Sequence, residues 1–181
     1  AIDLHEIPRI VTGMSELDLV LGGGLVSGSC ILVGGEPGAG KSTLLLQALC
    51  KISRTQSALY VTGEESPQQI AMRADRLGLR SEKLQIMTET SVEKLCFVAE
   101  KQRPKILVVD SIQVMHREEI SSAPGSVSQV REGAAMLVRF AKKTGTVLIL
   151  VGHVTKDGSL AGPKVLEHMI DCSLMLESST G

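Results

Sequence analysis

Apolar residues gather in short uninterrupted runs along the chain, and segments of mixed character separate these runs. Continuous rather than alternating runs are typical of strands that are buried on both faces of a sheet. The runs cover residues 30–33, 58–62, 84–87, 106–109, 146–151 and 172–176. The pattern therefore predicts six buried β-strands.

The segments between the runs show helical spacing of their apolar residues. Two sets each share one helix face, namely Val92, Leu95, Cys96 and Ala99, and then Val127, Val130, Ala134, Leu137, Val138 and Ala141. Another helix is predicted to begin at Ser66, where Pro67 and Gln69 complete the pattern of a capping box, and to end at Gly78. Strands that alternate with helices predict an α/β fold, a doubly wound and mostly parallel sheet with helices on both faces.

Ligands of such sheets bind at the carboxyl ends of the strands. After the first buried run, residues 34–43 read Gly-Gly-Glu-Pro-Gly-Ala-Gly-Lys-Ser-Thr and fit the P-loop pattern G-x-x-x-x-G-K-[ST]. The backbone amides of such a loop and the N-terminus of the next helix bind polyphosphate. The candidate nucleotide-binding residues are Gly35, Glu36, Pro37, Gly38, Ala39, Gly40, Lys41, Ser42 and Thr43.

Two of these residues have expected roles in catalysis. We expect Lys41 to reach the β- and γ-phosphates of ATP and the Ser42 hydroxyl to bind Mg²⁺. The alternative is a glycine-rich turn that only happens to carry a lysine. A second ligand for Mg²⁺ is Asp110, which ends the run 106–109, and we expect this strand to lie beside the P-loop strand. An aspartate that merely caps a turn is the alternative at this position.

A carboxylate that activates water must come from a different strand, because Ser111 and not Glu follows Asp110. The run 58–62 leads to Glu64 and Glu65. Glu64 is the first candidate for the catalytic base and Glu65 the second. The alternative is that the two acids only stabilise the N-terminus of the helix that follows.

Composition narrows the class of protein. The 181 residues are 43% hydrophobic and 22% charged, a globular mixture that excludes disorder over most of the chain. Lys+Arg number 19 and Asp+Glu number 20, so there is no chain-wide attraction to nucleic acid or to an anionic membrane. No apolar run approaches the ~20 residues that span a bilayer, and the first residues are acidic where a secretory signal is basic. We expect a cytoplasmic protein without a membrane partner.

Cysteine and aromatic residues exclude two further kinds of site. Cys30, Cys50, Cys96 and Cys172 show no C-x-x-C spacing, so we expect reduced thiols packed like small apolar groups and no zinc site among them. Aromatic residues make up only 2% of the chain, too few for a platform of rings that stacks single-stranded bases. Charge and backbone groups would therefore hold any bound DNA.

Longer motifs carry a resemblance to a known family. Residues 12–18 and 22–25 look like the entry to RecA-type ATPase cores. The other matching stretches resemble the ATPase core of the bacterial DNA-repair family RadA, also called Sms. They cover residues 40–47, 60–66, 73–79, 109–113, 122–132, 152–156 and 166–169.

This resemblance implies a single RecA-like P-loop domain over residues 1–181. It implies an Mg²⁺-dependent ATPase of a DnaB-like helicase that promotes branch migration of recombination intermediates. The implied partners are single-stranded or branched DNA, further copies in a hexameric ring, and the recombinase RecA. The family's four-Cys zinc module, Lys-Asn-Arg-Phe-Gly motif and Lon-like domain lie outside these residues, so we expect this stretch alone to hydrolyse ATP weakly.

Two loops are candidates for contact with DNA. By likeness to RecA, residues 115–126 form the first, and their Ser, Gly and Pro content favours mobility, although an ordinary surface loop fits equally well. Residues 152–163 form the second. Here His153 takes the place of a γ-phosphate sensor, or is a strand-end histidine bonded to backbone, while Lys156 and the nearby Lys164 are candidate DNA ligands. Arg131 and Arg139 are expected on a solvated helix face.

Two functions of different classes remain open at this point. One is an ATP-hydrolysing motor that moves on DNA. The other is a nucleotide-gated assembly, a ring or filament in which hydrolysis only resets the conformation. A phosphotransferase of the KaiC kind is a more distant third.

Overall fold

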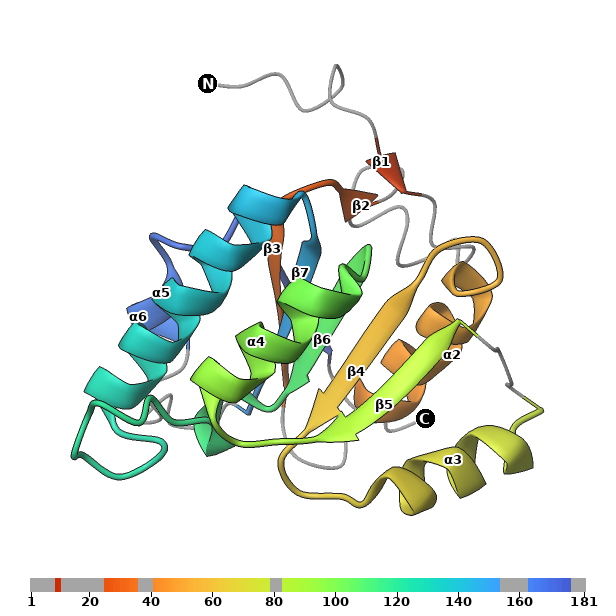
Figure 1. The fold of residues 1–181 in the computed structure, drawn as a ribbon, viewed down its shortest axis with the longest axis horizontal. Coiled ribbons are helices and arrows are strands. Elements are labelled where there is room, and N and C mark those ends of the chain that lie inside the picture. Colours follow the sequence, from red (N-terminus) through yellow and green to blue (C-terminus); the bar gives the residue numbers. More distant parts are fainter. Residues whose placement is uncertain (1–8, 11–24, 36–40, 79–82, 154–162, 177–181) are drawn as a thin grey trace.

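The computed structural model describes residues 9–10, 25–35, 41–78, 83–153 and 163–176. Six strands form one sheet in the order β5-β4-β6-β7-β3-β8, and all neighbouring pairs are parallel (Figure 1). Their bounds are β3 Cys30–Gly35, β4 Ala58–Thr62, β5 Leu84–Thr88, β6 Ile106–Asp110, β7 Val147–His153 and β8 Cys172–Leu176. A small antiparallel pair precedes the sheet, formed by β1 Arg9–Ile10 and β2 Leu25–Val26.

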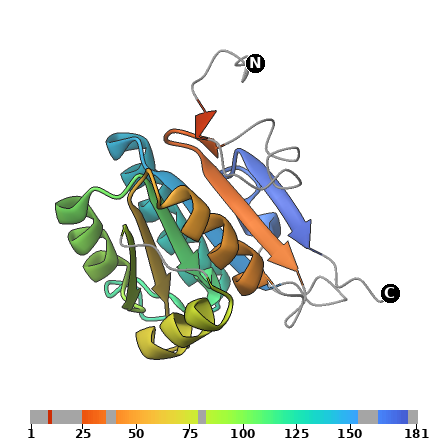
Figure 2. The ribbon, with the colours of Figure 1, turned by 90° about the vertical axis from the view of Figure 1, so that its right-hand side faces the viewer.

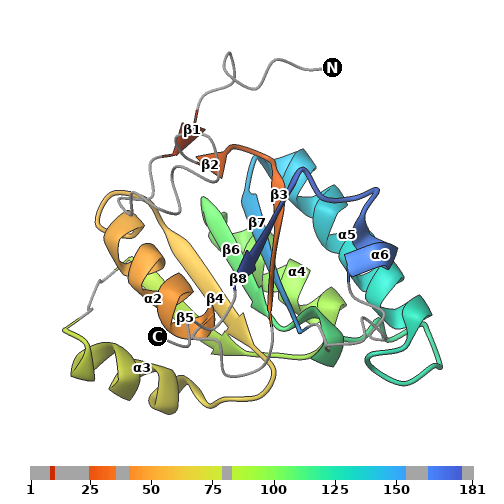
Figure 3. The ribbon, with the colours of Figure 1, turned by 180° about the vertical axis from the view of Figure 1, so that it is seen from behind.

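Helices cover both faces of the sheet, as the alternating pattern predicts. On one face lie α4 Val92–Gln102, α5 Val127–Thr144 and the short α6 Pro163–Leu166. The opposite face carries α2 Lys41–Ile52, and α3 Pro67–Arg76 packs on the same side (Figures 2 and 3). One 3-10 turn, η2 Ile112–Val114, follows β6 directly. The predicted α/β fold is therefore confirmed.

Each of the strands β3, β4, β6 and β7 supplies apolar residues to two separate cores, because successive side chains point to opposite faces. In β3, Ile31 and Val33 pack with Leu45 of α2, whereas Leu32 packs with Leu137 of α5. All four strands in the middle of the sheet repeat this division. Burial on both faces explains why the runs are continuous in the sequence.

The predicted boundaries of α3 are also confirmed. The Ser66 hydroxyl accepts a hydrogen bond from the Gln69 N–H (3.2 Å), and the Gln69 side chain accepts one from the Ser66 N–H (2.9 Å). After Leu77 the backbone of Gly78 turns to φ +70°, a conformation that glycine adopts without a steric penalty. The capping box therefore fixes where α3 begins.

One predicted feature of the sheet is wrong. The strand that ends in Asp110 does not lie beside the P-loop strand, because β7 lies between β6 and β3. Asp110 is thus two strand spacings, about 10 Å, from β3. Apolar runs in the sequence identify the strands, but the order of the strands in the sheet depends on how the connections between them cross the sheet. Within the described residues, no helix is both long and apolar enough to cross a membrane.

Candidate nucleotide site

The carboxyl ends of four adjacent strands bring the predicted groups to one edge of the sheet. Asp110 is paired with Thr62 of β4 on one side and with Val151 of β7 on the other. His153, the last residue of β7, is paired with Gly35 at the end of β3. The edge therefore presents, in order, the chain after β4, Asp110, His153 and the start of the P-loop.

The P-loop pattern begins at the end of β3 and runs into α2. Gly35 is the last residue of β3, and Lys41 is the first residue of α2. Residues 36–40 lie outside the described residues, as do the side chains of Lys41 and Ser42. Strand and helix flank the motif in the order that a phosphate-binding loop requires.

Asp110 is a buried carboxylate with a phenol donor. Its exposed fraction is 8%, and the Tyr60 hydroxyl from β4 donates a hydrogen bond to its Oδ2. A donor of this kind orients the carboxylate. The peptide bond to Ser111 is cis. Mg²⁺ held on phosphates needs only one or two protein oxygen ligands, and an oriented carboxylate at this edge fits that requirement.

The two glutamates after β4 have different surroundings. The buried Thr62 hydroxyl accepts hydrogen bonds from the N–H groups of Glu64 (3.2 Å) and Glu65 (3.1 Å), which fixes the path of the backbone. The Glu65 carboxylate then pairs with the guanidinium of Arg73 on α3. The Glu64 carboxylate is exposed and has no hydrogen bond or ion pair among the described residues. Of the two acids, Glu64 is the more exposed, whereas the Glu65 carboxylate is engaged by Arg73.

His153 is held through its backbone. Its N–H donates to Gln113 Oε1 (3.3 Å), and its carbonyl oxygen accepts from Gln113 Nε2 (3.2 Å). One amide side chain from η2 thus binds both backbone groups of the residue. The half-buried residue is paired in the sheet with Gly35, the last residue of the P-loop strand.

Comparison with known proteins agrees with this arrangement. A family model described as an AAA domain matches residues 6–159. The chain belongs to the AAA domain family. As an AAA domain with a P-loop, it is of a class that binds nucleotides and hydrolyses ATP.

The AAA domain is also similar to named bacterial proteins. It is 63% identical to DNA repair protein RadA of Escherichia coli over 176 residues, 97% of this chain and 38% of that protein. Identity to DNA repair protein RadA of Pseudomonas aeruginosa is 58% over 179 residues, 99% of this chain and 40% of that protein. Identity to DNA repair protein RadA of Bacillus subtilis is 49% over 178 residues, 98% of this chain and 39% of that protein. The chain thus spans about two fifths of these relatives, and the resemblance to RadA is confirmed.

The loop 115–126 of this AAA domain is bonded at several points. Gln129 of α5 is buried, accepts from the Arg117 N–H (2.8 Å), and donates to the carbonyl oxygens of Ile120 (3.0 Å) and Ser122 (2.8 Å). These bonds oppose the mobility that the composition of the loop favours. Its exposed charged residues are the two acids Glu118 and Glu119, which makes the loop a poor binder of phosphate.

Arg117, the one strong base of this loop, is already paired. Its Nε donates to Glu93 Oε2 (2.9 Å), and its guanidinium lies 3.4 Å from Glu119. Burial alone would raise the pKa of Glu93, but hydrogen bonds from Arg117 and from the Glu118 N–H lower that pKa below its ordinary value. The pair therefore fastens the loop to α4 and does not offer a positive charge to DNA.

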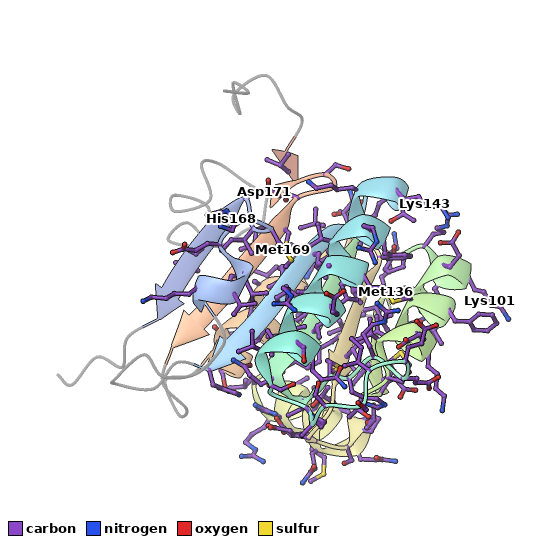
Figure 4. The ribbon with its side chains drawn as sticks, turned by 90° about the vertical axis from the view of Figure 1, so that its left-hand side faces the viewer. Lys101, Met136, Lys143, His168, Met169 and Asp171 are labelled. Carbon is purple, nitrogen blue, oxygen red and sulfur yellow. The ribbon has the colours of Figure 1, made fainter. Side chains whose placement is uncertain are left out.

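The other predicted DNA ligands are dispersed. Lys156 lies outside the described residues, and Lys164 is exposed on α6. Arg131 and Arg139 are exposed on α5, as expected for a solvated face. Figure 4 shows the side of the molecule that carries α4 and α5. Two further lysines, Lys101 and Lys143, point outward there near the C-terminal ends of these helices.

All four cysteines are reduced, as predicted. Cys30 and Cys50 are buried, and Cys96 and Cys172 are half-buried. Burial raises the pKa of Cys30 to about 12 and that of Cys96 to about 11, with neighbouring acids adding to the effect. Such thiols are protonated at neutral pH and behave as apolar groups.

Three residues of the site were not found from the sequence, namely Tyr60, Thr62 and Gln113. Tyr60 is the single tyrosine of the chain and lies inside an apolar run. A buried tyrosine hydroxyl usually has a hydrogen-bond partner, so its position indicates that an acceptor is buried nearby. Thr62 ends the same run. No local pattern distinguishes Gln113, because its partners are 40 residues away in the chain.

Proposed function

We propose that this domain is the Mg²⁺-dependent ATPase core of a DNA-repair motor that acts on single-stranded or branched DNA. The observation that carries the proposal is the alignment of Glu64, Asp110, His153 and the P-loop strand along one edge of the sheet. The relatives support the repair context, because they are named DNA repair protein RadA. The whole domain, residues 1–181, is proposed to work as one RecA-like unit.

Each residue at the edge has a proposed task. Residues 35–43 cradle the triphosphate, with Lys41 on the β- and γ-phosphates. Ser42 and Asp110 hold Mg²⁺, whose charge offsets the charge that develops on the phosphates. The exposed Glu64 orients and deprotonates the attacking water, and Tyr60 keeps Asp110 in place.

Coupling to DNA is assigned to the chain that follows β7. His153 senses the γ-phosphate, and Lys156, with Lys164, contacts the DNA backbone. Since Arg117 is paired and the exposed charges of loop 115–126 are acidic, that loop is the weaker candidate. Further copies of the chain in a hexameric ring complete the site, and the recombinase RecA is a proposed partner.

The first experiment measures binding of Mg²⁺ and a non-hydrolysable ATP analogue by calorimetry. Wild-type protein should bind, and Lys41→Ala should lose on the order of 100-fold or more in affinity, because a charge on the β- and γ-phosphates is removed. Lys142→Ala, an exposed lysine on α5, is the matched control and should bind like wild type. Absence of nucleotide binding by folded wild-type protein would overturn the proposal.

A strand-displacement assay on the full-length protein separates a motor from a nucleotide-gated assembly. A motor unwinds duplex or moves a branch only with hydrolysable ATP. DNA-stimulated hydrolysis without unwinding or branch migration would favour the assembly, in which hydrolysis resets the conformation.

DNA binding has its own test. Lys156→Ala should weaken binding to single-stranded DNA, and the slope of log K against log salt should fall by about one unit for each phosphate that the protein no longer neutralises. An unchanged slope would show that Lys156 does not touch the DNA backbone.

A further inference from the structure

The turn after Asp110 touches the ends of both neighbouring strands. On the β4 side, Val114 packs against Gly63, where an added Cβ would lie only 2.5 Å from Val114 Cγ2. Toward β7, Gln113 exchanges two hydrogen bonds with the backbone of His153. The short turn η2 therefore connects the residue before Glu64 with the last residue of β7.

Gln113 takes the place of a neighbouring strand at the end of β7, on the side that faces β6. The ladder between β6 and β7 ends at the pair Asp110 and Val151, yet β7 continues to His153. Beyond this pair, the side-chain amide of Gln113 supplies both the acceptor and the donor that a backbone neighbour would supply. The position of the β7 end is thus tied to a residue three positions after Asp110, within a turn that also contacts Gly63.

We propose that Gln113 is a positioning residue that couples DNA binding to ATP hydrolysis. Displacement of the β7 end by DNA pulls on the Gln113 amide, and η2 passes this displacement to Asp110 on one side and, through Gly63, to Glu64 on the other. The inference rests on the proposed function, because it assigns a route between two sites of that function. The task it assigns to Gln113 is to hold the end of β7 and not to bind nucleotide or DNA.

Three variants of the full-length protein test the route. Gln113→Ala removes both hydrogen bonds to His153, and Gln113→Glu keeps the shape but loses the N–H donor. Thr146→Val is the matched control, because Thr146 Oγ1 donates to the carbonyl oxygen of Pro104 (3.0 Å) and ties the same two strands at their other ends. For each protein, nucleotide affinity, kcat and KM for ATP are measured with and without single-stranded DNA, together with the melting temperature.

The stimulation ratio, kcat with DNA over kcat without it, distinguishes coupling from stability. The ratio should fall about tenfold in Gln113→Ala, the scale set by loss of two oriented hydrogen bonds, and about threefold in Gln113→Glu, which loses one, while nucleotide affinity stays within about threefold in both. Thr146→Val should melt at a lower temperature and keep the ratio within about twofold of wild type.

Three results would overturn the coupling role. One is a ratio near the wild-type value in Gln113→Glu, and another is an equal reduction in Thr146→Val. The third is wild-type hydrolysis that DNA does not stimulate, which would leave the ATPase proposal intact. A wild-type protein that binds no nucleotide would instead overturn the proposed function itself.

Discussion

Side-chain hydrogen bonds have different roles at the two edges of the sheet, where the strands begin and where they end. At the amino edge, side chains tie one strand start to another, as Thr146 does with Pro104 and as Asp171 does with the Cys30 N–H (2.8 Å). At the carboxyl edge, Thr62, Tyr60 and Gln113 bind the segments that carry the candidate chemistry. Substitutions at the amino edge should therefore change stability alone, whereas those at the carboxyl edge should also change hydrolysis.

The largest effect is expected at Glu64. Glu64→Gln should lower kcat for ATP by about 10²–10⁴-fold, because the water loses its base, while nucleotide affinity stays within about threefold. Steady-state hydrolysis and calorimetry measure the two quantities. Glu65→Gln is the control and should retain most of the turnover, since the carboxylate of Glu65 is occupied by Arg73. Unchanged hydrolysis in Glu64→Gln would transfer the role to Glu65 or to another residue.

A smaller effect at the same edge is expected from Tyr60→Phe. Loss of the donor to buried Asp110 should raise the Mg²⁺ concentration for half-maximal hydrolysis by about tenfold, as for other residues that orient a metal ligand. It should also lower the free energy of unfolding by about 1–3 kcal/mol. Titration of Mg²⁺ in the ATPase assay provides the measurement. In an Asp110→Asn background the same change should have little further effect, and an unaltered Mg²⁺ requirement would contradict the role of Tyr60.

Thr146→Val sharpens the comparison from the amino edge. It leaves the buried carbonyl oxygen of Pro104 without its donor, so the free energy of unfolding should fall by about 1–3 kcal/mol. Urea unfolding followed by circular dichroism gives this value. The basal kcat should stay within about twofold of wild type, because the residue is at the opposite end of β7 from His153. A basal kcat that falls by clearly more than about twofold would remove the distinction between the edges.

The smallest effect is a pH dependence at Glu93. Because its pKa is lowered in the folded state, its ion pair with Arg117 stabilises the fold above the unfolded pKa near 4.5, and this stabilisation is lost as the pH falls through the folded pKa. Glu93→Gln should therefore lower the free energy of unfolding at pH 7 by about 1 kcal/mol and by less at pH 3. Urea unfolding at the two pH values tests this. An equal difference at both pH values would show that charge plays no part.

Local patterns were sufficient for much of the fold. The capping box at Ser66 and Gln69, the strand 58–62 and the strand-to-helix transition at Lys41 depend on neighbours in the chain, and all three are confirmed. The placement of Asp110 beside the P-loop strand failed, because β7 enters the sheet from a later segment. The sequence ranks Glu64 before Glu65 as the candidate base, and the ion pair of Glu65 with Arg73 is a further difference between the two acids that no local pattern contains.

The sequence alone determined the periodicity, and with it the strands, the helices and the strand ends at which polar groups gather. Such features arise from side-chain direction and turn chemistry over a few residues. Tertiary structure decided the strand order and the hydrogen-bond partner of Asp110. It also decided the two hydrogen bonds between Gln113 and the backbone of His153, which is 40 residues away. Contacts between distant segments depend on how the crossovers pack, and that is a property of the whole sheet.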